Sequence, residues 1–180
     1  KLPRIIFVTN MDDDHASFRE LVLKLERRFG RCIAPFQLPI RENEKFVGYV
    51  NVVKMAGRRF TNLSDYEECE IPDYSQKNLG IARDALLEAV AETSEEYMER
   101  YFSGEEFTLE EIQGALREHV IDGSIVPVLM GSGANCQGFK TLLQVIDRYL
   151  PTPDKFECIG VDVSTGERFT AKYNDQVSLS

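Results

Sequence analysis

The sequence predicts an α/β protein built around a parallel β-sheet. Two short apolar runs, residues 5–8 and 124–130, are nearly uninterrupted, as is typical of strands buried on both faces of a parallel sheet. Each run ends in polar or small residues and leads into a segment with helical periodicity. Between the two lies a long stretch of mixed patterns, residues 31–123. We therefore expect two strand–turn–helix units interrupted by an α+β insert.

The first helix is predicted over residues 18–29. Its apolar residues recur at spacings of three and four, and Gly30 is a natural helix end. Asp14 is the predicted N-cap, and the acidic residues 12–14 suit the positive end of a helix dipole. With His15 these carboxylates also allow a metal cluster, but acidic residues that open a helix are the preferred interpretation.

The insert begins with strand patterns and continues with helical ones. Residues 32–40 are predicted to be extended and residues 46–53 to form a strand. Short antiparallel strands are predicted at residues 59–60 and 66–71, with turns at Gly57 and Asn62. Helical periodicity begins at residue 76, with Ser75 as the predicted N-cap. A restart is expected at Ser94 and a helix end at Gly104. Thr108 and Glu111 have the spacing of a capping box, which predicts a further helix.

The last part of the chain changes character again. Residues 139–150 have helical periodicity, and prolines at 151 and 153 then break the pattern. Strand patterns at residues 158–163 and 168–179, with a turn at 164–166, predict the start of another domain. Because the chain begins at Lys1 and ends inside a strand pattern, we expect it to be a segment of a longer polypeptide.

Composition excludes several classes of protein. Hydrophobic residues make up 43% and charged residues 28%, which is ordinary for a globular protein. The net charge of −9 argues against sequence-specific nucleic acid as a partner, because phosphate binding needs clustered lysine and arginine. No run has the length of a membrane span and no signal peptide is present, so a cytoplasmic location is expected. The four cysteines lack close pairs and are expected to be reduced.

The turns after the two buried strands contain the candidate site. Guanine presents its N1–H and amino group side by side, and one carboxylate such as that of Asp12 accepts from both. A turn of small residues, Ser132-Gly133-Ala134, offers backbone N–H groups to the carbonyl oxygen of the base. The carboxyl ends of neighbouring parallel strands face one crevice, so these groups are expected to lie together. The alternative for Asp12 is a simple helix cap.

These stretches carry a family resemblance. The run from Arg4 to Asp12, RIIFVTNMD, resembles the guanine-specificity strand of translational GTPases, whose pattern is N-K-x-D. Residues 126–132, VPVLMGS, are similar to the strand before their S-A turn. Residues 34–40, 46–54 and 88–92 resemble the insert of bacterial elongation factor G, and residues 149–153 its exit linker. The chain is identified as a member of the elongation factor G family, with peptide-release factor three and the ribosome-protection proteins as the next relatives.

The resemblance implies a fold and a domain organisation. The fold would be part of a P-loop GTPase-type parallel sheet with helices, interrupted by an α+β insert and followed by the first strands of a β-barrel domain. Residues 1–30 and 124–150 would form the C-terminal part of the GTPase domain. Residues 31–123 would form the insert, and residues 151–180 the linker and the start of the second domain.

Only some of the candidate site residues match the family pattern. It implies that Asp12 reads the guanine edge and that Ser132 begins the S-A turn, with Gly133 in place of the alanine. Thr9 and Asn10 stand where the family has asparagine and lysine. Asn10 is too short to cover the purine ring, and Thr9 offers only a hydroxyl. A lost hydrogen bond costs about 1 kcal/mol, so these departures predict weakened nucleotide affinity, with compensation elsewhere in the full protein as the alternative.

Phosphate-binding motifs are absent from this chain. It has neither G-x-x-x-x-G-K-[ST] nor a D-x-x-G ahead of the first strand, and no catalytic or metal-binding residue is assigned. GTP hydrolysis consists mainly of positioning phosphates and stabilising their charge. We therefore expect no tightly bound nucleotide and no activity from this chain alone. The resemblance implies that the parent binds GTP or GDP with Mg²⁺ and hydrolyses GTP to drive ribosomal translocation.

Two questions about partners and function stay open at this point. Residues 88–111 contain many glutamates, which is typical of a solvated face. The resemblance implies instead that the insert contacts the stalk protein of the large ribosomal subunit. A ribosome-associated paralogue with a decayed nucleotide site, acting as a binding or regulatory module, is the alternative function. The departures at Thr9 and Asn10 motivate it.

Overall fold

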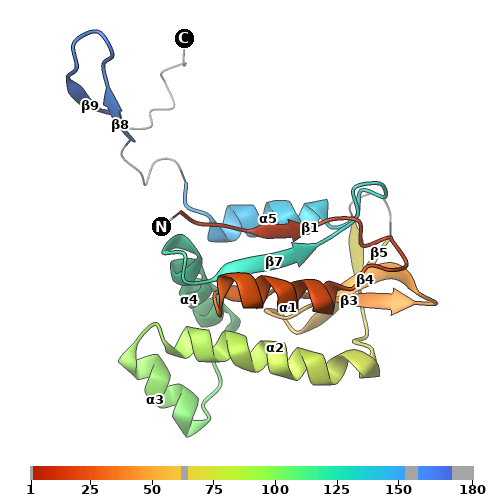
Figure 1. Cartoon of the computed structure of the whole chain (residues 1–180). Helices are drawn as coiled ribbons and strands as arrows, with labels where there is room; N and C mark the ends of the chain where they lie inside the picture. Colours follow the sequence, from red (N-terminus) through yellow and green to blue (C-terminus); the bar gives the residue numbers. More distant parts are fainter. Residues whose placement is uncertain (1, 62–64, 153–157, 172–180) are drawn as a thin grey trace. The chain divides into compact units, whose positions relative to one another are not determined.

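The computed structural model describes residues 2–61, 65–152 and 158–171. The chain divides into two units, Lys1–Leu150 and Pro151–Ser180. The predicted α/β fold is confirmed, and the first unit contains both the parallel sheet and the insert (Figure 1).

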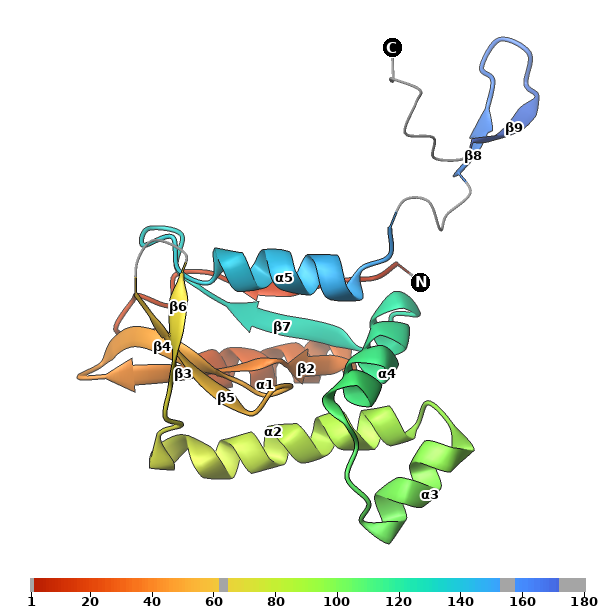
Figure 2. The same ribbon diagram turned by 180° about the vertical axis from the view of Figure 1, so that it is seen from behind.

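A three-stranded parallel sheet lies at the centre of the first unit. Strand β7 (Val126–Met130) is the middle strand, and β1 (Ile6–Val8) and β2 (Ile33–Pro35) each pair with it in parallel. Every residue of β7 is buried. Helix α1 (Phe18–Phe29) covers one face and α5 (Phe139–Tyr149) covers the other, as the two opposite views show (Figures 1 and 2). Coverage of both faces explains the uninterrupted apolar runs in the sequence.

The strand β2 is a departure from the sequence prediction. Its residues were expected to belong to the insert, but they complete the parallel sheet with β1 and β7. The backbone N–H of Phe36 still donates to the carbonyl of Val128, at 3.1 Å, before the chain turns away. The sequence could not show this, because only the pairing with β7 in the tertiary structure distinguishes this short extended segment from a strand of the insert.

The insert contributes a four-stranded antiparallel sheet in sequence order. It consists of β3 (Gln37–Glu42), β4 (Lys45–Asn51), β5 (Ala56–Phe60) and β6 (Tyr66–Cys69). Gly57 lies inside β5, so the predicted turn at this residue is wrong. A Cβ at Gly57 would lie 2.5 Å from the carbonyl oxygen of Cys69, which shows that close strand approach requires the glycine. Asn62, the other predicted turn, lies outside the described residues.

Three helices follow, and their ends test the predicted caps. They are α2 (Asp73–Ala91), α3 (Glu95–Ser103) and α4 (Leu109–Ile121). The restart is confirmed, because the Ser94 hydroxyl accepts from the backbone N–H of Tyr97 at 3.1 Å. Gly104 ends α3 in the left-handed conformation, as expected. Ser75 is wrong as a cap, because α2 begins two residues earlier, after Pro72, and Ser75 is buried in its first turn.

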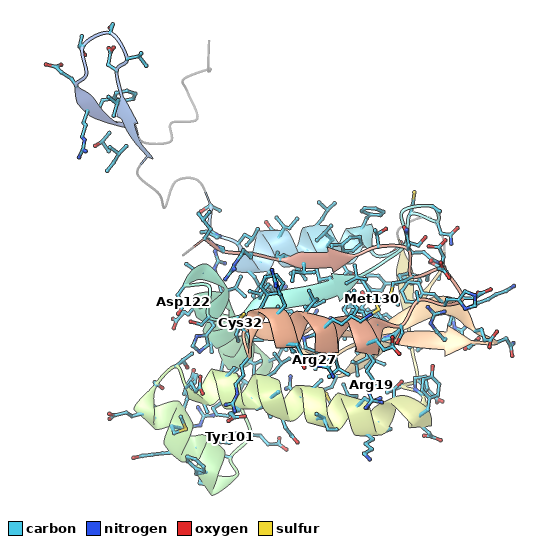
Figure 3. The ribbon with its side chains drawn as sticks, viewed as in Figure 1. Arg19, Arg27, Cys32, Tyr101, Asp122 and Met130 are labelled. Atoms are coloured by element: carbon cyan, nitrogen blue, oxygen red, sulfur yellow. The ribbon has the colours of Figure 1, made fainter. Side chains whose placement is uncertain are left out.

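The insert and the parallel sheet share one hydrophobic core. A single cluster of buried side chains joins the antiparallel sheet, α2, α4, β7 and α5. It includes Phe36, Val50, Leu79, Leu86, Ile112, Leu116, Leu129 and Tyr149. On the other face of β7, Val126, Val128 and Met130 pack with Phe18 and Val22 of α1. Figure 3 labels Met130, the fully buried last residue of β7.

In the described part of the second unit, two strands form a hairpin. Strand β8 (Cys158–Val161) pairs in an antiparallel manner with β9 (Arg168–Ala171). The predicted turn is confirmed at Gly166, which has φ of 74° and donates its N–H to the carbonyl of Asp162. The predicted continuation of the second strand, residues 172–179, lies outside the described residues.

The capping box at the start of α4 gives a pH-dependent prediction. Glu111 accepts from Arg100 at 2.8 Å and from the backbone N–H of Thr108 at 2.7 Å. The ion-paired hydrogen bond to Arg100 and the bond to Thr108 lower the pKa of Glu111 from 4.5 to about 2. The carboxylate therefore stabilises the fold fully above pH 4.5, and this contribution is lost as the pH falls toward 2.

We expect Glu111→Gln to lower the melting temperature at pH 7, and the difference from the wild type to shrink as the pH falls below about 4.5. Thermal melts between about pH 3 and pH 7 measure this. Glu110→Gln, an exposed neighbour in the same helical turn, is the matched control. A difference that stayed constant with pH would contradict the assignment.

Candidate functional site

The turns that follow β1 and β7 lie together at the carboxyl end of the parallel sheet (Figure 1). We call residues 9–16 the first loop and residues 131–138 the second loop. The backbone N–H of Met11 donates to the carbonyl of Gly131 at 3.1 Å, and the N–H of Gly131 donates to the carbonyl of Val8 at 2.9 Å. The two loops are therefore joined by main-chain hydrogen bonds, as the parallel sheet predicts.

The first loop is a compact turn and does not open the helix directly. Asp13 accepts from the backbone N–H of His15 at 2.8 Å, and its own N–H donates to the carbonyl of Asn10. Helix α1 begins only at Phe18, and Ser17 is its N-cap. The predicted cap at Asp14 and the acidic helix start are therefore wrong. A carboxylate that closes a local turn satisfies backbone donors before the helix begins.

Asp12 is exposed on this loop. Within the described part of the chain, no hydrogen bond or ion pair engages its carboxylate. The side chains of Thr9 and Asn10, by contrast, are hydrogen-bonded to each other. The Thr9 hydroxyl donates to the side-chain oxygen of Asn10 at 3.2 Å. Asn10 has φ of 60°, a left-handed conformation that asparagine tolerates better than most residues.

The second loop is held from inside by Ser132. This residue is fully buried, and its hydroxyl accepts from the backbone N–H of Asn135 at 3.1 Å. Its main chain exchanges two hydrogen bonds of 3.0 Å with Gln137. Gly133 and Ala134 are exposed, and among the described residues their backbone N–H groups have no acceptor. The loop thus presents two exposed backbone donors that have no acceptor in the described part of the chain.

Glycines fix how close the second loop comes to its surroundings. A Cβ on Gly131 would lie 2.2 Å from the carbonyl oxygen of Gln137 and 2.6 Å from the ring of Phe7, so no larger residue fits. A Cβ on Gly133 would instead lie at an ordinary contact distance of 3.5 Å from the Thr9 hydroxyl. This distance places the sequence-predicted residues Thr9 and Gly133 side by side.

Arg41 on β3 is a site residue that the sequence analysis missed. Its Nη2 atom donates to the backbone carbonyls of Met11, Ala16 and Asp13 at 2.9, 3.1 and 3.3 Å. Its Nη1 atom donates to the carbonyl of Glu44 at 2.6 Å. One guanidinium therefore connects the insert to the first loop. No local signal marks it, because an arginine in a strand pattern is usually a solvated side chain.

We expect Arg41→Met to destabilise the protein by about 2 kcal/mol, because it removes a charged donor from several carbonyls at once. It should also increase amide hydrogen exchange in the first loop. Urea unfolding and hydrogen-exchange mass spectrometry measure the two effects. The control is Arg59→Met in β5, where the arginine pairs with Glu42 at the surface. Equal effects of the two substitutions would contradict the role given to Arg41.

Comparisons with known proteins agree with this arrangement. The model of the family described as "Elongation factor Tu GTP binding domain" matches residues 1–152. A crystal structure of a protein from Thermus thermophilus is 34% identical and superposes with a TM-score of 0.76. The match covers 86% of this chain and 23% of that chain, so the present chain spans about a quarter of the length of its structural relative.

The parallel sheet with its two joined loops is thus the sheet of a GTP-binding domain of the translation-factor class. The chain belongs to the translational GTPases and is of the elongation factor G type.

Two further observations concern the described residues only. None of their helices is both long enough and apolar enough to cross a membrane. No three of their histidine, cysteine, aspartate or glutamate side chains converge in the way that a metal ion needs.

Proposed function

We propose that the protein containing this chain binds guanine nucleotides and hydrolyses GTP to drive translocation on the ribosome. This chain would supply the loops that read the base. The observation that carries the proposal is the free carboxylate of Asp12 on a loop whose neighbouring residue, Met11, is hydrogen-bonded to the second loop.

The chemistry of the two loops supports this role. The Asp12 carboxylate would accept from N1–H and from the exocyclic amino group of guanine, which are adjacent donors. The free N–H groups of Gly133 and Ala134 would donate to the guanine carbonyl oxygen. Adenine reverses this pattern of donors and acceptors, so the loops would select guanine. Ser132 would hold the second loop in shape from inside.

Phosphate and Mg²⁺ binding would come from residues outside this chain. The printed sequence has no P-loop pattern, and hydrolysis depends on phosphate positioning. We propose that the 180-residue chain alone neither hydrolyses GTP nor binds it tightly. We also propose the domain organisation given above, with residues 1–30 and 124–150 as the last part of the GTPase domain. In that scheme β2 would be shared between this domain and the insert.

Titration calorimetry of the full-length protein with GDP and with ADP tests the proposal. Tight binding of GDP with strong discrimination against ADP would support it. A folded full-length protein that binds neither nucleotide would contradict it. The same result would favour the second candidate, a ribosome-associated paralogue with a decayed nucleotide site.

The observation that favours this second candidate is the conformation around Asn10. The Asn10 side chain accepts a hydrogen bond from the Thr9 hydroxyl. It is also too short to lie over a purine ring, because asparagine lacks a long aliphatic stem. Asn10→Lys separates the two functions. In a working GTPase the substitution should tighten GDP binding, whereas a decayed site should remain without measurable binding.

We further propose that the acidic surface of the insert binds the stalk protein of the large ribosomal subunit. Residues 88–111 contain nine glutamates and one arginine, and Arg100 is already paired with Glu111 and Glu105. Phe102 on α3 is 79% exposed and would add an apolar contact.

Reversing the charge of Glu95, Glu96 and Glu99 should abolish binding of the purified stalk protein. The control is the same reversal at Glu20 of α1, which lies outside the insert. Unchanged stalk binding by the triple variant would contradict this partner.

A further inference from the structure

A pocket with charged and polar residues in its walls lies in the first unit, between the antiparallel sheet and α5. Its volume is about 160 Å³. The walls include residues of β3 to β6 on one side and Thr141, Gln144 and Val145 of α5 on the other. Among the described residues, neither Asp12 nor the residues of the second loop line it. Recognition of a base by Asp12 and the second loop therefore does not involve this pocket.

Arg58 is the unusual residue of this pocket. Only 5% of it is exposed, and its guanidinium carbon lies 4.2 Å from the ring centroid of Tyr66. Its Nη1 atom donates to the hydroxyl of Tyr49 at 3.1 Å, whereas its Nε–H has no acceptor among the described residues. No described carboxylate lies within 4.0 Å of its guanidinium. A buried cation without a counter-ion is strongly unfavourable.

Gln37 also lines the pocket and contains an unpartnered buried donor. It is 1% exposed, and its Oε1 atom accepts from the backbone N–H of Met130 at 2.8 Å. This hydrogen bond identifies the atom that accepts as the carboxamide oxygen, so the other atom is the Nε2 donor. Nε2 has no partner among the described residues. Lys54 and Arg148 also line the pocket, against one carboxylate, Asp147. The wall therefore combines an excess of positive charge with buried donors.

We propose that this pocket binds a small oxyanion, either a phosphate or a carboxylate. The ion would pair with the guanidinium of Arg58 and neutralise this buried charge, and Lys54 and Arg148 would add positive potential at the wall. Arginine favours such ions because its planar fork donates two parallel hydrogen bonds to an oxyanion. A volume of 160 Å³ is sufficient for an ion of four or five non-hydrogen atoms, because a cavity needs only about 10–15 Å³ of this kind of volume to hold one water molecule.

The test uses the full-length protein saturated with GDP, so that the nucleotide site does not contribute. Sodium phosphate and sodium acetate are titrated against sodium chloride at constant ionic strength, with calorimetry and thermal melting as readouts. We expect saturable binding and a higher melting temperature with one of the two oxyanions. The oxyanion that binds identifies the ligand class. If neither acts beyond chloride, the proposal is overturned.

Substitutions in the pocket test whether the oxyanion binds there. Arg58→Gln should weaken oxyanion binding about ten- to hundredfold, the equivalent of one charged hydrogen bond. The matched control is Arg59→Gln, because this adjacent arginine pairs with Glu42 at the surface and should leave binding unchanged. Gln37→Glu is a second, nearly isosteric variant that brings a counter-charge into the pocket and should abolish oxyanion binding without unfolding the protein. Binding that persists in both pocket variants would overturn the proposal.

Discussion

Replacing Asp12 with asparagine is expected to weaken GDP binding by the full-length protein by at least about a hundredfold. The carboxylate accepts two hydrogen bonds from guanine, and charge-assisted bonds contribute ~1.5–3 kcal/mol each. Asparagine keeps one acceptor but places an amide N–H₂ group against the amino group of the base. The same substitution should improve binding of xanthosine diphosphate, because xanthine has a carbonyl oxygen in place of that amino group.

Competition titrations with GDP and xanthosine diphosphate measure this change of specificity. The matched control is Asp14→Asn, which removes the same charge from the same exposed loop. It should leave the ratio of the two affinities unchanged. If both variants weakened GDP binding equally, Asp12 would contribute only a general negative potential and the base-reading role would be rejected.

Gly131→Ala is expected to lower the free energy of unfolding by about 3 kcal/mol and to disrupt the second loop. The new methyl group would lie 2.2 Å from a backbone oxygen and 2.6 Å from the ring of Phe7, so the strand end and the loop would have to separate. The carbonyl of Gly131 also accepts the hydrogen bond from Met11. The loss of stability should therefore be accompanied by weaker GDP binding.

Gly133→Ala, two residues further along the same loop, is the control. Its Cβ would meet only the Thr9 hydroxyl at 3.5 Å, and alanine is the residue of the family pattern. It should be neutral in thermal melts and in GDP titrations. A Gly131→Ala variant as stable as Gly133→Ala would show that the loop is less tightly packed than the structure indicates.

Local sequence signals predicted many of the secondary-structure boundaries correctly. The caps at Ser94 and Gly104 and the capping box at Thr108 are confirmed, because each depends on residues no more than about four positions apart. The two buried strands were also identified, since coverage by helices on both faces leaves an uninterrupted apolar run.

The wrong predictions involve competition between a local signal and another contact. Asp14 has the chemistry of a cap, but Asp13 closes a turn first and Ser17 caps the helix. Gly57 has the chemistry of a turn, but the close approach of β6 requires a glycine inside a strand. In both cases the residue type indicated a real structural preference, but contacts in the folded chain determined which structure the residue adopts.

For the candidate site, the sequence by itself indicated the class of protein through its family resemblance, and it predicted the residues that could recognise a base. It did so because the strand–turn patterns around Asp12 and Ser132 are contiguous in the chain. Only the tertiary structure decided that β2 joins the parallel sheet, that Arg41 holds the first loop, and that Arg58 lies buried without a described counter-ion. These features depend on pairing, hydrogen bonding and burial between segments far apart in sequence, which leave no periodic or local pattern to recognise.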